Sequence, residues 1–159
     1  MRWFRFAVLI LAGTILQKGV FERLHTRPDL LLILLVFFAV YCSTSDAIIT
    51  SFAIGFAADL IGSPMPMGAH MIGFGVFGTL LAYLNRVIAI KRMPHQALAI
   101  FAVGLLAGAT ACLLARESAS TGLYSGLLRT AVCSAIVGPF LMAPVAWCMH
   151  IKMNRSSRR

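Results

Sequence analysis

The sequence predicts an all-α integral membrane protein, a bundle of about six transmembrane helices. Apolar residues make up 60% of the chain and charged residues 12%, whereas a soluble domain has roughly 45–50% apolar and 25% charged residues. The apolar residues fall in long runs without charge, and the polar residues between them are too few to give a soluble core a hydrated surface. We therefore expect a single multi-pass membrane domain over residues 1–159.

Six apolar runs approach the length that a membrane span needs, about 20 residues for roughly 30 Å of hydrocarbon. The first, about residues 3–21, is apolar apart from Arg5, Gln17 and Lys18, which lie near its ends. It resembles a signal peptide, but no small-x-small cleavage site follows, so we expect a retained helix. The other expected helices cover about residues 30–44, 46–61, 68–84, 97–115 and 128–151, followed by a basic cytoplasmic tail at 152–159.

The second run is short, because Leu30–Tyr41 gives only about 18 Å of helix. Either this helix extends over the next three residues, or it is part of one longer helix over residues 30–51, which would leave five spans. Charge favours six spans, because Lys and Arg are retained on the cytoplasmic side. With the N-terminus inside, six spans place nine of the 14 Lys and Arg residues on the inner side and five outside. Both termini are then cytoplasmic.

The residues that could carry chemistry form no catalytic or metal-binding pattern. The four cysteines have neither metal spacing nor a C-x-x-C arrangement, and we expect them to pack between helices. No phosphate loop, G-x-S-x-G or H-E-x-x-H motif occurs. The net charge of +9 is scattered over loop ends and the tail, which fits anionic lipid better than nucleic acid. We expect no enzyme activity, cofactor or metal.

Three ionisable residues lie near expected helix ends. Asp59 precedes the turn at 62–68, and we expect its carboxylate to accept hydrogen bonds from backbone N–H groups there. A proton or ligand site is the alternative, but we expect no second ionisable residue to lie nearby and form a relay with Asp59. On the structural interpretation Asp59→Asn keeps one acceptor oxygen and should be tolerated. Asp46 is expected to be the N-cap of the third helix, and His70 an interfacial packing residue.

Small residues recur four positions apart in two of the expected helices. These pairs are Gly104 with Gly108 and Ser51 with Gly55. Helices associate in lipid through close contact of small residues. We therefore expect these faces to pack against other helices.

Two motifs resemble the MreD family of bacterial rod shape-determining membrane proteins. The stretch Arg27-Pro28-Asp29, followed by a leucine-rich run, resembles the signature after that family's first helix. The next segment resembles the family's Gly-x-x-x-Asp-Leu and Gly-Ser-Pro-Leu-Gly elements through Gly55, Asp59, Gly62, Pro64 and Gly68. These motifs cover about residues 27–70, while length and helix order agree over the whole chain.

The resemblance implies a non-enzymatic component of the cell-elongation machinery in the bacterial cytoplasmic (inner) membrane, which maintains rod shape and directs lateral peptidoglycan synthesis. Its implied partners are MreC, MreB, RodA with its transpeptidase, and membrane lipid. The family's fold is similar to the substrate-binding subunits of energy-coupling-factor transporters, so a vitamin-binding transport subunit is the alternative. Those subunits use an Ala-x-x-x-Ala face on their first helix, whereas Ala7 and Ala12 lie five apart here. An intramembrane hydrolase ranks third, because no Ser–His pair has a recognisable setting.

Overall fold

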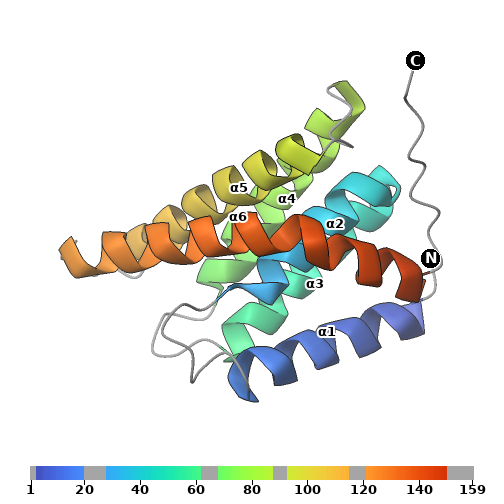
Figure 1. Ribbon diagram of the computed structural model, residues 1–159, viewed down its shortest axis with the longest axis horizontal. Coiled ribbons are helices and arrows are strands. Elements are labelled where there is room, and N and C mark those ends of the chain that lie inside the picture. The colour runs from blue at the N-terminus through green and yellow to red at the C-terminus, as the bar shows by residue number, and fades with distance from the viewer. Residues whose placement is uncertain (1–2, 20–27, 62–67, 88–92, 115–120, 150–159) are drawn as a thin grey trace.

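The computed structural model describes residues 3–19, 28–61, 68–87, 93–114 and 121–149, and in these it is all-helical. Six helices follow one another and pack side by side (Figure 1). They are α1 (Trp3–Gly19), α2 (Leu30–Tyr41), α3 (Thr44–Ile61), α4 (Ala69–Val87), α5 (Met93–Leu114) and α6 (Thr121–Met149).

The expected helices agree with these six in order, and the bounds differ at several ends. A single helix over 30–51 is wrong, because α2 ends at Tyr41 and α3 begins at Thr44. The last two helices begin earlier than expected, at Met93 and Thr121. Proline is favourable in a first helical turn, so Pro94 suits the start of α5. In α5 and α6 the helix begins several residues before the apolar run, so the run in the sequence covers only part of each helix.

The start of α3 shows that the expected N-cap, Asp46, is not the N-cap of this helix. Ser43, not Asp46, precedes the helix, and its Oγ accepts a hydrogen bond from the backbone N–H of Asp46 at 3.3 Å. The same hydroxyl donates to Asp46 Oδ2 at 2.9 Å. This reciprocal pair has the spacing of a capping box, in which the acidic residue lies in the first turn. Asp46 therefore supports the cap without being the N-cap itself.

Helix α2 lies at the centre of the bundle and contacts each of the other five helices. Every residue from Leu31 to Val40 is buried, as expected for a helix that is apolar on all sides. Its C-terminal end also needs partners, because the last carbonyl groups of a helix lack them within the helix. Asn85 Nδ2 donates to Val40 O at 2.8 Å, and Gln96 Nε2 donates to the Tyr41 hydroxyl at 2.8 Å. Polar side chains of α4 and α5 thus fix this end of the short helix.

Helices α3 and α4 pack at very close range through small residues. A Cβ atom built on Gly55 would lie 2.6 Å from Met71 Cα and 2.9 Å from His70 O. One on Gly78 of α4 would collide with the Ser51 side chain. The expected small-residue face at Ser51 and Gly55 therefore meets a helix of the same chain.

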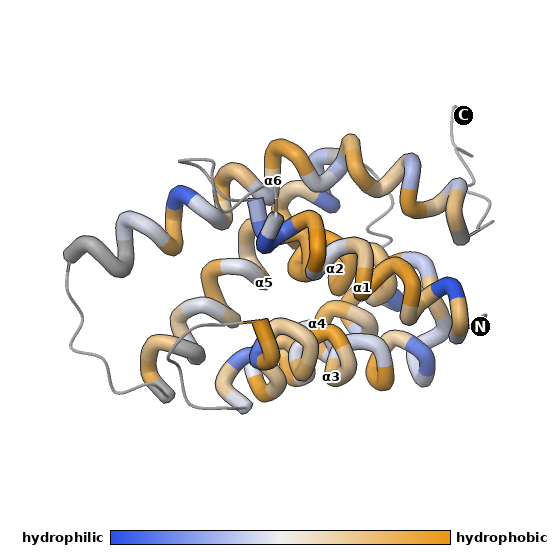
Figure 2. Tube along the Cα trace, turned by 90° about the horizontal axis from the view of Figure 1, so that it is seen from below, coloured by the Kyte–Doolittle hydropathy of each residue, from blue (hydrophilic) through white to orange (hydrophobic). Residues whose placement is uncertain are grey.

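The outward surface of the bundle carries large apolar side chains. Hydrophobic residues dominate the helix bodies in Figure 2, and Phe4, Phe140 and Trp147 are 82%, 76% and 80% exposed. Within the part of the chain that the structure describes, two stretches are long and apolar enough, by length and composition, to cross a bilayer, Thr44–Ile61 and Ser125–Cys148. Leu30–Tyr41 and Pro94–Thr110 are shorter apolar helices.

Candidate functional site

Asp29 joins three helices at one end of the bundle, which we call the Asp29 end. Its Oδ1 accepts hydrogen bonds from the backbone N–H groups of Leu31 and Leu32 at 3.1 and 3.2 Å, which makes it the N-cap of α2. Gln17 Nε2 of α1 donates to the same oxygen at 3.2 Å. The Asp29 backbone N–H donates to Ser134 Oγ of α6 at 2.8 Å, and Ser134 is fully buried. One residue thus ties α1, α2 and α6 together.

The surroundings of Asp29 shift the pKa of its carboxyl group in opposite directions. Burial raises the pKa of this carboxyl group above its usual range, while hydrogen bonds from Leu32 and Gln17, the nearby His70 and a hydrogen bond from Leu31 act in the opposite direction. All three of these bonds reach Oδ1, and no side chain or backbone group of the described residues donates to Oδ2. Beside it, Gln17 Oε1 is buried and has no partner among the described residues. Two acceptor atoms at this end, Asp29 Oδ2 and Gln17 Oε1, thus receive no hydrogen bond from the described residues.

Asp59 holds the start of α4 with both of its carboxylate oxygens. Oδ1 accepts from the backbone N–H of His70 at 2.9 Å, and Oδ2 accepts from Gly68 and Met71 at 3.0 and 2.9 Å. Gly68 has a φ of +102°, a conformation that glycine adopts at low cost. The structure agrees with the interpretation of Asp59 as a carboxylate that binds backbone N–H groups after the turn.

His70 gives Asp59 an ionisable neighbour that the sequence did not suggest. Its Nδ1 lies 3.2 Å from Asp59 Oδ1, and its ring packs edge-on against Phe74 with the ring centroids 5.9 Å apart. The expectation that Asp59 lacks a second ionisable residue nearby is therefore wrong. The chain turns back between α3 and α4, which brings residues eleven positions apart into contact.

A cavity of about 180 Å³ lies at the Asp29 end, among α2, α4, α5 and α6. Asp29, His70, Thr130 and Cys112 supply its polar lining. The Thr130 hydroxyl donates to its own helix, at Gly126 O, over 3.0 Å. Thr130 and Cys112 stand in no motif, so periodicity and spacing gave no signal that they share a cavity with Asp29.

The two expected packing glycines of α5 also line this cavity. A Cβ on Gly104 would lie 2.8 Å from Leu32 Cδ2, and one on Gly108 would lie 2.5 Å from Leu127 Cδ1. Both glycines therefore face helices of the same chain, α2 and α6. Their small size leaves the space in which the cavity forms.

The structure brings the two sequence motifs to one end of the molecule. The cavity is lined by Asp29 from the first motif and by His70, which Asp59 of the second motif contacts. Pro28, next to Asp29, is buried. The motif residues Arg27, Gly62 and Pro64 lie outside the described residues.

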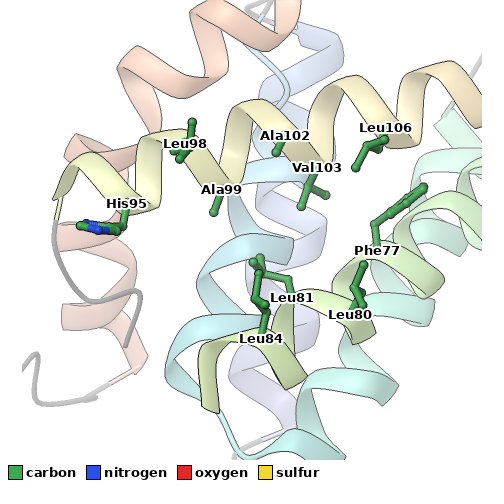
Figure 3. A pocket seen from close by; sticks show the side chains of 10 residues that line it. All are labelled: Phe77, Leu80, Leu81, Leu84, His95, Leu98, Ala99, Ala102, Val103 and Leu106. Atoms are coloured by element: carbon green, nitrogen blue, oxygen red, sulfur yellow. The ribbon is translucent and has the colours of Figure 1, made fainter. Parts of the chain in front are cut away.

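A second cavity, of about 300 Å³, lies between α4 and α5 and is almost wholly apolar. Figure 3 shows Leu80, Leu81 and Leu84 of α4 across from Ala99 and Val103 of α5. His95, at the start of α5, is the only lining residue with an ionisable side chain, and the other lining residues are leucine, alanine, valine and phenylalanine. Among the described residues there is also no cluster of three or more His, Cys, Asp or Glu side chains that could hold a metal ion.

One comparison with known proteins gives a match. The family model described as rod shape-determining protein MreD matches residues 1–146, which reach from the start of the chain into α6. No curated protein and no solved structure matches the chain significantly.

Proposed function

Because the chain belongs to the MreD family of rod shape-determining proteins, we propose that it is a non-enzymatic membrane component of the bacterial cell-elongation machinery. It binds MreC and helps to direct lateral peptidoglycan synthesis by the complex that contains MreB, RodA and its partner transpeptidase. The observation that carries this proposal is the extent of the family match, which includes five helices and most of the sixth.

The exposed surface supports six spans in the cytoplasmic membrane. Large contiguous apolar patches are rare on soluble monomers, whereas exposed side chains such as Leu11, Phe140 and Trp147 suit contact with lipid. Helix α2 is too short to cross roughly 30 Å alone. Its ends are instead enclosed by longer helices and bonded to their polar side chains, which removes the need for water at either end.

The two chain ends support a cytoplasmic location for both termini. The Arg5 guanidinium at the start of α1 donates to Cys148 O at the end of α6 over 3.4 Å. An even number of spans brings the start of the first helix and the end of the last helix to the same side of a membrane. With the basic tail inside, the Asp29 end faces outward.

A binding role, without turnover, fits the way in which the polar residues are used. Both oxygens of Asp59 accept backbone hydrogen bonds, and Asp29 Oδ1 caps α2. These bonds hold helix ends in place. The protein then serves as a rigid platform whose outward helix faces are free to meet the transmembrane helix of a partner.

Detergent co-purification with tagged MreC tests the partner directly. We expect the chain to be retained by MreC and lost when the MreC transmembrane segment is replaced by an unrelated membrane helix of equal length. Equal retention by both baits, or recovery with a vitamin-transport ATPase in place of MreC, would contradict the proposal.

Two cavities bear on a vitamin-binding subunit. The one at the Asp29 end, of about 180 Å³, is below the range of about 300–1,000 Å³ typical of sites that enclose a drug-sized ligand. The one between α4 and α5, of about 300 Å³, reaches the lower limit of that range, but His95 is the only polar side chain in its lining. The vitamin-binding reading therefore ranks second.

A further inference from the structure

The apolar cavity between α4 and α5 opens on the outer surface of the bundle, and we call it the α4–α5 groove. Leu80 and Leu98 line it and are 58% and 65% exposed, whereas Leu81 and Val103 are buried and form its floor. The core of a bilayer contains no water. An apolar hollow that opens on it is therefore filled by a lipid chain or by an apolar side chain of a partner.

The length of the groove distinguishes between these two occupants. His95 lies at one end of it and Leu106 near the other (Figure 3). These residues are eleven positions apart in α5, which corresponds to about 16 Å of helix. One leaflet is half of a hydrocarbon core of roughly 30 Å, or about 15 Å. A phospholipid acyl chain extends over one leaflet, whereas a partner's transmembrane helix would continue far beyond the end of the groove.

The volume of the groove also suits one acyl chain. A methylene group is similar in size to a water molecule, which takes about 30 Å³ of liquid volume. The groove, with about 300 Å³, then accommodates roughly ten methylene groups. That is the larger part of a single acyl chain, and the leucine, alanine, valine and phenylalanine side chains of the lining match its chemistry.

The charges near the His95 end of the groove indicate which lipid binds. Arg86 lies in the last turn of α4, and Lys91 and Arg92 precede α5 in the sequence, while residues 60–116 include no Asp or Glu. Basic residues at the cytoplasmic side attract anionic lipid headgroups. We propose that the α4–α5 groove binds one acyl chain of an anionic phospholipid, with its headgroup at the His95 end. The assignment of this lipid to the inner leaflet rests on the proposed function, through its six spans.

Native mass spectrometry of the full chain, released from nanodiscs, tests the headgroup. The nanodiscs contain equal amounts of phosphatidylglycerol and phosphatidylcholine with identical acyl chains. We expect the chain to retain phosphatidylglycerol at least about fivefold over phosphatidylcholine, the factor by which one basic residue near the membrane surface favours an anionic lipid. Arg86→Gln should lower this preference several-fold. Lys18→Gln, at the exposed end of α1 on the opposite side, should leave it unchanged. Equal retention of the two lipids, or equal effects of the two substitutions, would overturn the proposal.

A substitution that fills the groove tests where the acyl chain lies. Ala102 of α5 lines the groove and is exposed, so Ala102→Phe occupies the hollow without displacing a core residue. It should remove one retained phosphatidylglycerol molecule per chain. The matched control is Ala12→Phe, at an exposed position of α1 outside the groove. Thermal unfolding in detergent checks the fold of both variants. If both retain the same amount of lipid, the proposal fails.

Co-purification of the same two variants with tagged MreC separates a lipid from a partner helix in the groove. We expect Ala102→Phe and Ala12→Phe to lose lipid to different extents, as above, and MreC retention to be the same for Ala102→Phe as for the unchanged chain. If Ala102→Phe instead lowers MreC retention and keeps its lipid, a partner helix occupies the groove and the lipid proposal is wrong. Lipid retention is measured on the chain alone, so a failure of the unchanged chain to bind MreC would contradict the proposed function and not the lipid site.

Discussion

Asp59 shows how a single carboxylate can hold the junction of two helices. Its two oxygens accept three backbone hydrogen bonds, from Gly68 and from His70 and Met71 in the first turn of α4, and the His70 ring lies against one of these oxygens. Sequence spacing pointed to such a role for Asp59. It could not show that both oxygens are used, because that depends on how the chain turns between α3 and α4.

The use of both oxygens reverses the expected outcome of Asp59→Asn. An amide offers one acceptor, so at least one backbone N–H of the α4 start loses its partner, at a cost of about 1–3 kcal/mol. The matched control is Asp46→Asn, where one oxygen accepts from the Ser43 hydroxyl and the loss should stay below about 1 kcal/mol. Thermal unfolding in detergent compares the two variants, and equal stability would contradict this account of Asp59.

Ser134 provides a second test at the scale of one residue. It is fully buried and accepts the backbone N–H of Asp29. Ser134→Ala leaves this N–H without a partner, which should lower the free energy of unfolding by about 1–3 kcal/mol. Ser45→Ala, at an exposed position in the first turn of α3, is the control and should have little effect. Two equal midpoints of thermal unfolding would show that α2 does not depend on this bond.

One short helix, α2, contacts each of the other five helices and organises the bundle. The sequence identified α2 as an apolar run of insufficient length, and the structure shows why that length suffices. Its two ends are bonded to side chains of α1, α4, α5 and α6. Apolar periodicity could not reveal this arrangement, because a helix buried on all sides has no polar face to orient it.

The crossing of α3 and α4 yields a prediction about Gly55. A methyl group there would meet backbone atoms of Met71 and His70, so the helices must separate, at a cost of about 1–3 kcal/mol. Gly126 of α6 has nothing within 4 Å of such a methyl. Gly126→Ala should therefore be neutral or stabilising, by up to about 1 kcal/mol. Unfolding of both variants in detergent measures the difference, and a Gly55→Ala protein as stable as Gly126→Ala would contradict the close crossing.

For the whole molecule, composition and apolar runs were enough to predict six helices in their order, and two motifs were enough to indicate the family. Residues such as Thr130, Cys112 and Ser134 could not be foreseen, because they lie far from Asp29 in sequence and meet it only through helix packing. The helix packing expected at Gly104 and Gly108 illustrates the same limit. Their spacing predicted helix packing but could not tell that the other helices belong to the same chain.

Topology follows from the proposed six spans and can be measured directly. Reporter fusions at residue 90 and after Arg159 should both give a cytoplasmic signal, because both positions adjoin basic segments that are unfavourable to translocate. A fusion within residues 116–118 should report the opposite side. Opposite signals from the first two fusions would mean an odd number of spans between them and would contradict the six-span arrangement.

The central claim is that this member of the MreD family supports rod shape by binding within the elongation complex. Depleting it in its own host, while cell width and vitamin uptake are followed in parallel, tests that claim most directly. The account predicts that cells widen or become round while uptake is unchanged, and that an intact copy restores their width. Cells of unchanged shape that lose vitamin uptake would contradict it and would favour a transport subunit.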